Sequence, residues 1–129
     1  MLGKGVFDYV NVLESSLNAT SARTNLILNN LANANTPHYK RKDIRFETEL
    51  KQAFIRANGD SVDAKVKDLD LNALKPQAYT DYSELSFRYD GNNVDINNEE
   101  GILAKTEIKY EGLMDLLNKS FSQIQSVLK

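Results

Sequence analysis

The sequence predicts a mainly α-helical protein in which long N- and C-terminal helices pair as an antiparallel coiled-coil-like bundle. The middle is predicted to be loop-rich, with a short helix and a small β-hairpin. Apolar residues recur at helical spacing over roughly the first thirty and the last thirty residues, and the pattern breaks between them. These observations predict a terminal-helix core made of residues 1–36 and 97–129, with residues 37–96 as a separate middle segment.

The first predicted helix runs from about Val6 to Asn35. Its apolar positions alternate between spacings of four and three, as in a coiled-coil seam: Val6, Val10, Leu13, Leu17, Thr20, Thr24, Ile27, Leu31 and Ala34. The two central threonines predict a seam that is weak in its middle. Such a helix would extend about 45 Å at 1.5 Å per residue, so it needs a long partner. We expect Asn35 to close it in a left-handed conformation and Pro37 to stop it at Thr36.

The partner helix is predicted at the other end of the chain, from about Asn97 to Val127. Asn97 or Asn98 would cap its start, and Glu99 and Glu100 would occupy the first turn, where the helix dipole favours acids. The apolar faces of the two helices predict a helix-pair core of Val10, Leu13, Leu17, Ile27, Leu31, Leu103, Tyr110, Leu113, Leu117, Phe121 and Ile124.

The middle segment carries weaker patterns. A short amphipathic helix is expected over residues 46–57, ending near the turn signal Asn58-Gly59, and residues 60–72 suggest at most transient order. From residue 84 apolar and polar residues alternate, and Asp90-Gly91-Asn92-Asn93 can turn the chain into Val94-Asp95-Ile96. This pattern predicts the β-hairpin.

The end of the first helix has an unusual composition: Asn30-Leu31-Ala32-Asn33-Ala34-Asn35-Thr36-Pro37, followed by Tyr39-Lys40. Asn30 and Asn33 lie three residues apart, so they share a helix face. Because asparagine is a mediocre helix former, this polar ladder indicates partners outside the helix. Tyr39 offers an apolar ring with a hydrogen-bonding tip, as interface residues often do.

This stretch resembles the signature of the flagellar basal-body rod proteins, bacterial axial proteins whose terminal segments pack together in a tube. The short length and the spacing to Asn93-Val94-Asp95-Ile96 are most similar to the B-type proximal members. The family usually has glycine where this chain has His38; histidine could also adopt a positive φ there. The resemblance implies a subunit interface that includes Asn30, Leu31, Ala32, Asn33, Asn35, Thr36, Pro37, Tyr39 and Lys40.

The resemblance further implies a structural subunit of the proximal rod, assembling into a helical tube that transmits torque. The implied partners are copies of itself, other rod proteins, the ring-to-rod adaptor and export-gate components. The implied place is the periplasmic rod of the basal body, reached by export without a cleaved signal peptide. Two alternatives stay open: another rod subtype, or a helical-hairpin export chaperone or adaptor.

Composition argues against several other classes of protein. The net charge is −2 and the one basic run, Lys40-Arg41-Lys42, suits a solvated helix-end or interface patch, so no nucleic-acid partner is expected. Cysteine is absent, which excludes disulfides and thiolate metal sites. No apolar window approaches the roughly 20 residues of a membrane span, so we expect no membrane insertion.

The sequence also lacks a constellation for catalysis. His38 is the only histidine and lies among cationic neighbours, without an acidic residue nearby to orient it. Asp95, Glu99 and Glu100 could be imagined as glycosidase carboxylates, but acids at a helix start are far more often caps. We therefore expect no enzymatic activity, no metal and no cofactor.

Overall fold

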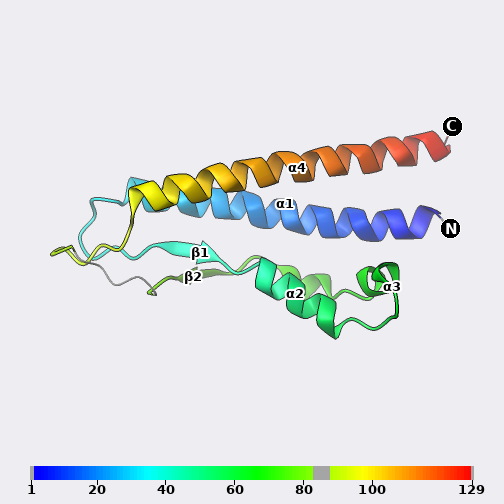
Figure 1. Ribbon diagram of the computed structural model, residues 1–129, viewed down its shortest axis with the longest axis horizontal. Coiled ribbons are helices and arrows are strands. Elements are labelled where there is room, and N and C mark those ends of the chain that lie inside the picture. The colour runs from blue at the N-terminus through cyan, green and yellow to red at the C-terminus, as the bar shows by residue number, and fades with distance from the viewer. Residues whose placement is uncertain (1, 83–87, 129) are drawn as a thin grey trace.

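Two long antiparallel helices dominate the computed structural model, which describes residues 2–82 and 88–128 (Figure 1). Helix α1 (Leu2–Ala32) and helix α4 (Ile96–Leu128) lie side by side, with both chain termini at the same end. The middle segment lies along the other side of α1, so that α1 is placed between α4 and the middle segment (Figure 1). The predicted mainly α fold with paired terminal helices is confirmed.

The middle segment contains more regular structure than its sequence predicts. Its elements are β1 (Lys42–Ile44), α2 (Glu47–Arg56), α3 (Val62–Lys67), the 3₁₀ helix η1 (Leu71–Leu74) and β2 (Ala78–Thr80). Helix α2 confirms the predicted short helix. The expectation of transient order over residues 60–72 is wrong, because the side chain of Ser61 caps α3 and that of Asp70 caps η1.

The small sheet exists, but not at the predicted place. Strands β1 and β2 pair antiparallel, with Lys42 opposite Thr80 and Ile44 opposite Ala78. The predicted second strand is wrong, since residues 94 and 95 form no strand and Ile96 begins α4; residues 83–87 of the predicted first strand lie outside the described residues. The Asp95 side chain accepts a hydrogen bond from the amide of Asn98 at 3.2 Å, so Asp95 rather than Asn97 or Asn98 caps this helix.

The main apolar cluster joins the middle segment to α1. Its buried members are Ala19, Ile44, Phe46, Ala53 and Leu74, with Ala22, Leu26, Leu50 and Leu69 packed around them. The alanines of α1 are small enough to let β1 and η1 approach the helix closely. The middle segment therefore shares a core with the terminal helices, which the division into residues 1–36 with 97–129 and residues 37–96 does not anticipate.

Burial along the helix pair extends into its middle, where the sequence predicts a weak seam. Thr20 and Thr106 are buried, and each hydroxyl donates to a carbonyl of its own helix at 2.7 Å. Small side chains with satisfied hydroxyls thus allow close packing without an unpaired polar group. Ile27 and Leu17 are also buried. The other predicted core residues of the pair are half-buried, namely Val10, Leu13, Leu31, Leu103, Leu113, Leu117 and Ile124.

Two residues predicted for the helix-pair core lie outside it. Tyr110 is 40% exposed and Phe121 is 47% exposed. Both lie on α4 beyond Thr106, where α1 is the only element that α4 packs against extensively in the described chain. One neighbouring helix covers only part of a wide apolar face, so this part of the face stays open to solvent.

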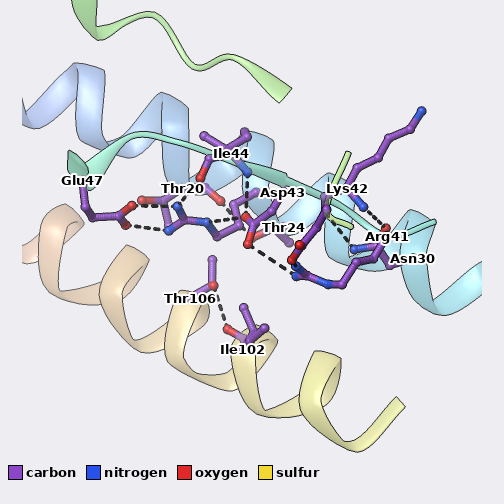
Figure 2. Close-up of polar contacts among 12 residues, drawn as sticks. Thr20, Thr24, Asn30, Arg41, Lys42, Asp43, Ile44, Glu47, Ile102 and Thr106 are labelled. Carbon is purple, nitrogen blue, oxygen red and sulfur yellow. Dashed lines mark hydrogen bonds and ion pairs between the residues drawn. The ribbon is translucent and has the colours of Figure 1, made fainter. Parts of the chain in front are cut away.

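An ionic cluster joins the start of α2 to both long helices. Arg23 of α1 donates to both carboxylate oxygens of Glu47 at 2.6 and 2.7 Å, and Lys109 of α4 donates to the same carboxylate at 2.6 Å. Figure 2 shows Glu47 at this junction. The hydrogen bonds from Arg23, with that from Lys109, hold the pKa of Glu47 well below its usual range although burial opposes the shift.

This shift predicts an acid-sensitive contribution to stability. Because the folded-state pKa of Glu47 lies below its ordinary value of 4.5, the cluster stabilises the fold above pH 4.5 and loses that effect as the pH falls below it. Glu47→Gln should lower the free energy of unfolding by about 1 kcal/mol at neutral pH, since the carboxylate is half exposed. Urea titrations at several pH values test this. A difference between variant and parent that stays constant down to pH 2 would contradict it.

Candidate functional site

The predicted signature stretch lies at the end of the helix pair where α1 ends and α4 begins (Figure 1). We call this the closed end, because loops of the same chain cover it. Helix α1 ends at Ala32 and continues in turns, with the amide of Thr36 donating to the carbonyl of Asn33 at 3.0 Å. The predicted stop at Thr36 is thus too late. Asn35 does not take the predicted left-handed conformation: among the described non-glycine residues only His38 has a positive φ.

Asn30 is completely buried at this end and fully hydrogen-bonded within the chain. Its Nδ2 donates to the carbonyl of Lys42 at 2.9 Å and to Glu99 Oε2 at 3.2 Å. Its Oδ1 accepts from the amide of Lys42 at 2.9 Å and from the Tyr39 hydroxyl at 3.1 Å. Its partners are outside the helix, as the sequence indicates, but inside the chain. Since a buried amide needs such bonds, Asn30 is corrected from a surface contact to an internal junction (Figure 2).

A buried ion pair lies beside Asn30. Arg41 donates through Nε to Glu99, whose side chain is fully buried, and through Nη1 to Asp81 Oδ2 at 2.6 Å. Burial opposes the charged form of Arg41, yet the bonds with Glu99 and Asp81 raise its pKa. Burial, together with the charge of Glu99, also raises the pKa of Tyr39. The expectation that the whole run 40–42 is solvated is therefore wrong at Arg41.

Asn92 holds the turns that follow α1, although it lies more than fifty residues further along the chain. Its buried Nδ2 donates to the carbonyls of Asn33, Ala34 and Thr36 at 2.8, 3.1 and 2.9 Å. All three carbonyls belong to the turns that follow Ala32, and the two hydrogens of one amide are shared among them. Asn93 acts similarly between strands, accepting from the amide of Arg41 at 2.8 Å. The sequence offers only an Asn-Asn pair in a turn signal, so this role in holding the turns after α1 is missed there.

His38 and Gly91 lie where the two loops cross. His38 has φ 62°, so histidine does adopt the positive φ anticipated for the position where the resembled family has glycine. Its amide donates to the carbonyl of Asp90 at 2.6 Å. Gly91 has φ 75°, and a Cβ there would lie 3.0 Å from His38 Nδ1. The absence of a side chain at Gly91 therefore leaves room for the two loops to cross.

The remaining signature residues divide by exposure. Ala32, Asn35, Thr36 and Pro37 are exposed, whereas Leu31, Asn33, Tyr39 and Lys40 are half-buried. The half-buried polar residues already have bonds within the chain: Asn33 Nδ2 donates to the carbonyl of Asn29 at 2.8 Å, and Lys40 Nζ donates to the carbonyl of Gly91. The exposed group therefore provides part of the surface of this end that a neighbouring molecule can reach.

The opposite end of the helix pair is open and apolar. A groove of about 450 Å³ lies between the two helix ends, lined by Val6, Phe7, Gln123, Ile124, Ser126, Val127 and Leu128. Phe7 is 56% exposed, Val127 65% and Leu128 80%. Contiguous exposed apolar side chains of this kind mark interaction surfaces in soluble proteins.

Among the described residues, no group of three or more His, Cys, Asp or Glu side chains is arranged to hold a metal ion. The buried carboxylate of Glu99 is paired with Arg41. Among the described helices, none is long and apolar enough to cross a membrane.

Comparisons with known proteins agree on one family. The family model described as "Flagella basal body rod protein" matches residues 11–40. The flagellar basal body rod protein FlgB of Bacillus subtilis is 31% identical over 119 residues, covering 90% of this chain and 89% of that protein. FlgB of Cereibacter sphaeroides is 32% identical over 126 residues, 97% of each chain. FlgB of Escherichia coli is 28% identical over 123 residues, 90% of this chain and 89% of that one.

The buried pair makes a first prediction for this site. Glu99→Gln should lower the free energy of unfolding by about 3 kcal/mol, because Arg41 loses a charged partner inside the protein. Urea unfolding followed by far-UV circular dichroism measures the loss. The matched control is Glu100→Gln, which changes the same group on the exposed neighbouring residue and should cost under about 0.5 kcal/mol. Equal effects of the two substitutions would refute the assignment.

The loop crossing makes a second prediction. His38→Val should destabilise the fold by about 1 to 2 kcal/mol, because a β-branched residue tolerates a positive φ poorly. His38→Gly should stay within about 0.5 kcal/mol of the parent, because glycine adopts this conformation readily. The same urea assay compares them. If the valine variant were as stable as the glycine variant, position 38 would not require this backbone conformation.

Proposed function

Since the chain belongs to the family of flagellar basal-body rod proteins, we propose that it is a structural subunit of the proximal rod that assembles into a tubular, torque-transmitting axial structure. The observation that carries this proposal is the difference between the two ends of the helix pair. One end is closed by buried, satisfied polar groups. The other end leaves an apolar groove between the helices. A subunit built this way is internally fixed at one end and incomplete at the other.

The open groove supports assembly because its apolar side chains would be covered by neighbours. Phe7 and Val127 contribute large exposed areas there, and burying apolar surface gains roughly 25 cal/mol per Å². Farther along α4, Ile108 and Leu116 are also exposed. An isolated hairpin gains nothing from these side chains, whereas a packed assembly would.

The proposed partners are copies of this chain, other rod proteins, the ring-to-rod adaptor and components of the export gate. The proposed location is the periplasmic part of the basal body, reached by export without a cleaved signal peptide. The family membership supports the basal-body location. The exposed signature residues Ala32, Asn35, Thr36 and Pro37, together with partly exposed Asn33 and Tyr39, are proposed interface residues at the closed end.

A catalytic role is not part of this proposal. The relatives bear the name of a rod protein, and the carboxylates at the closed end serve arginine pairs and a helix cap. A helical-hairpin export chaperone is less well supported, because none of the comparisons named above points to one. Another rod subtype is disfavoured by relatives that align along nearly the whole of both chains under the FlgB name.

The open groove makes this proposal testable in cells. Val127→Asp with Leu128→Asp should leave the fold intact, since both side chains are exposed, but should prevent incorporation into basal bodies because charge would replace apolar contact. Swimming in soft agar and the amount of the chain in purified basal bodies measure the effect. We expect motility to be lost while expression stays at the parental level.

The control is Ile55→Asp, which places the same charge on an equally exposed apolar residue of α2. Its motility should fall less than that of the double variant. Normal motility and normal incorporation of the Val127→Asp, Leu128→Asp variant would remove the assembly role from the groove.

A further inference from the structure

The turn between α2 and α3 contains the one asparagine of the sequence that is followed by glycine, Asn58-Gly59. Asparagine is among the chemically labile residues, because the backbone nitrogen of the next residue can attack its side-chain amide. Glycine in the next position favours this attack, since it has no side chain to shield the nitrogen and restricts the backbone least. Both residues are exposed, on the side of the molecule away from α4 (Figure 1).

The attacking nitrogen is free at this turn. The Gly59 amide donates to no acceptor among the described residues, so no hydrogen bond has to break before it reacts. At the other described asparagines outside the α-helices the next amide is engaged, since acceptors of the chain hold the amides of Ala34, Thr36, Ala73, Asn93 and Val94. Asparagines within the α-helices are protected in the same way, because the helical ladder engages the next amide.

The chain on both sides of the turn is fixed, while the turn itself stays accessible. The amide of Asn58 donates to Asp68 Oδ2 at 2.8 Å, and Lys65 Nζ donates to the carbonyl of Ala57 at 3.0 Å. A Cβ at Gly59 would lie 2.5 Å from the Cβ of Ala64, so the backbone of the turn packs directly on α3. A chemical change at residue 58 would therefore act on α3.

We propose that Asn58 is a site of spontaneous covalent modification, at which the chain converts its own asparagine into aspartate and isoaspartate. The Gly59 nitrogen forms a bond to Cγ of Asn58, the Cγ–Nδ2 bond breaks, and ammonia leaves with the proton that the Gly59 nitrogen loses. Water then opens the succinimide ring that has formed. Opening at the Cγ carbonyl gives aspartate, and opening at the backbone carbonyl gives isoaspartate. Water is the one co-reactant, and the conversion does not depend on the proposed function.

Both products would weaken the attachment of α3. Each places a carboxylate beside two existing acids, since Asp60 follows the turn and Asp68 already accepts from the amide of residue 58. Isoaspartate also adds a carbon atom to the backbone, at a turn that packs directly on α3. Helix α3 is joined to α1 by Tyr9, whose hydroxyl donates to Asp63 Oδ1 at 2.6 Å. We expect the modification to loosen this contact.

Peptide mapping of the full chain, kept folded at neutral pH and sampled over weeks, tests the assignment. Trypsin releases residues 57–65 as one peptide, in which Asn58 is the only asparagine. This peptide should gain the mass of one amide-to-acid conversion and separate into two products, while peptides with other asparagines stay unchanged. The rate should rise with pH, because the deprotonated amide is the attacking form. Asn58→Gln should abolish the mass gain, since the longer side chain closes a ring far more slowly.

The matched control is Ala73→Gly, which puts glycine after exposed Asn72, where the next amide donates to the carbonyl of Asp70 at 3.1 Å. In the folded chain Asn72 of this variant should react roughly fivefold or more slowly than Asn58, because its attacking amide is held in a hydrogen bond. In concentrated urea the two should react alike. Equal rates in the folded chain would overturn the selection of Asn58 by the fold. An unchanged peptide 57–65, while a synthetic peptide of the same residues converts, would overturn the site.

Hydrogen exchange of the modified chain measures the consequence for α3. The amides of α3 should exchange faster than in freshly prepared chain, whereas those of residues 99–106, far from the turn, should exchange as before. Unchanged exchange throughout α3 in the modified chain would contradict the loosening of its contact with α1.

Discussion

The buried pair of Arg41 and Glu99, with Asn30 beside it, is the interaction on which the rest of the structure depends. Asn30 belongs to α1, Arg41 precedes β1 and Glu99 lies in the first turn of α4, so the three join segments distant in sequence. Buried charges and amides tolerate little displacement, because each lost bond leaves a group unpaired. Apolar packing alone could slide by a helical turn. The polar junction instead fixes the register in which α1 and α4 meet.

This polar junction explains why the two ends of the helix pair differ in burial. From Asn30 toward the middle of α1, burial is deep and includes Ile27 and Thr20. Toward the termini each helix has fewer neighbours, and the apolar groove remains uncovered. Rigidity at one end and unsatisfied apolar surface at the other suit a subunit that becomes complete in an assembly. The ionic cluster around Glu47 extends the fixed region by holding α2 against both helices.

The sequence predicts the helices well because their signals are local. Periodicity locates α1, α4 and α2 to within a few residues, and the signature stretch correctly indicates a special site. Predictions fail where the deciding partner is far along the chain. Arg41 belongs to a basic run, and only the fold places Glu99 and Asp81 beside it. Asn92 lies in a stretch with the composition of a hairpin turn, and its hydrogen bonds to the turns after α1 join residues more than fifty positions apart. A threonine weakens a helix seam where its hydroxyl lacks a hydrogen-bond partner. The hydroxyls of Thr20 and Thr106 both have one.

Native-state hydrogen exchange of the isolated chain, resolved by residue, tests the central claim most directly. If the polar junction fixes the helix pair, the slowest-exchanging amides lie in residues 16–31 and 99–106, and protection declines toward both termini. The backbone amides near the two termini should become protected from exchange only in assembled material. Uniform protection along both helices, or slowest exchange near Phe7 and Ile124, would contradict a structure closed at Asn30 and open at its ends.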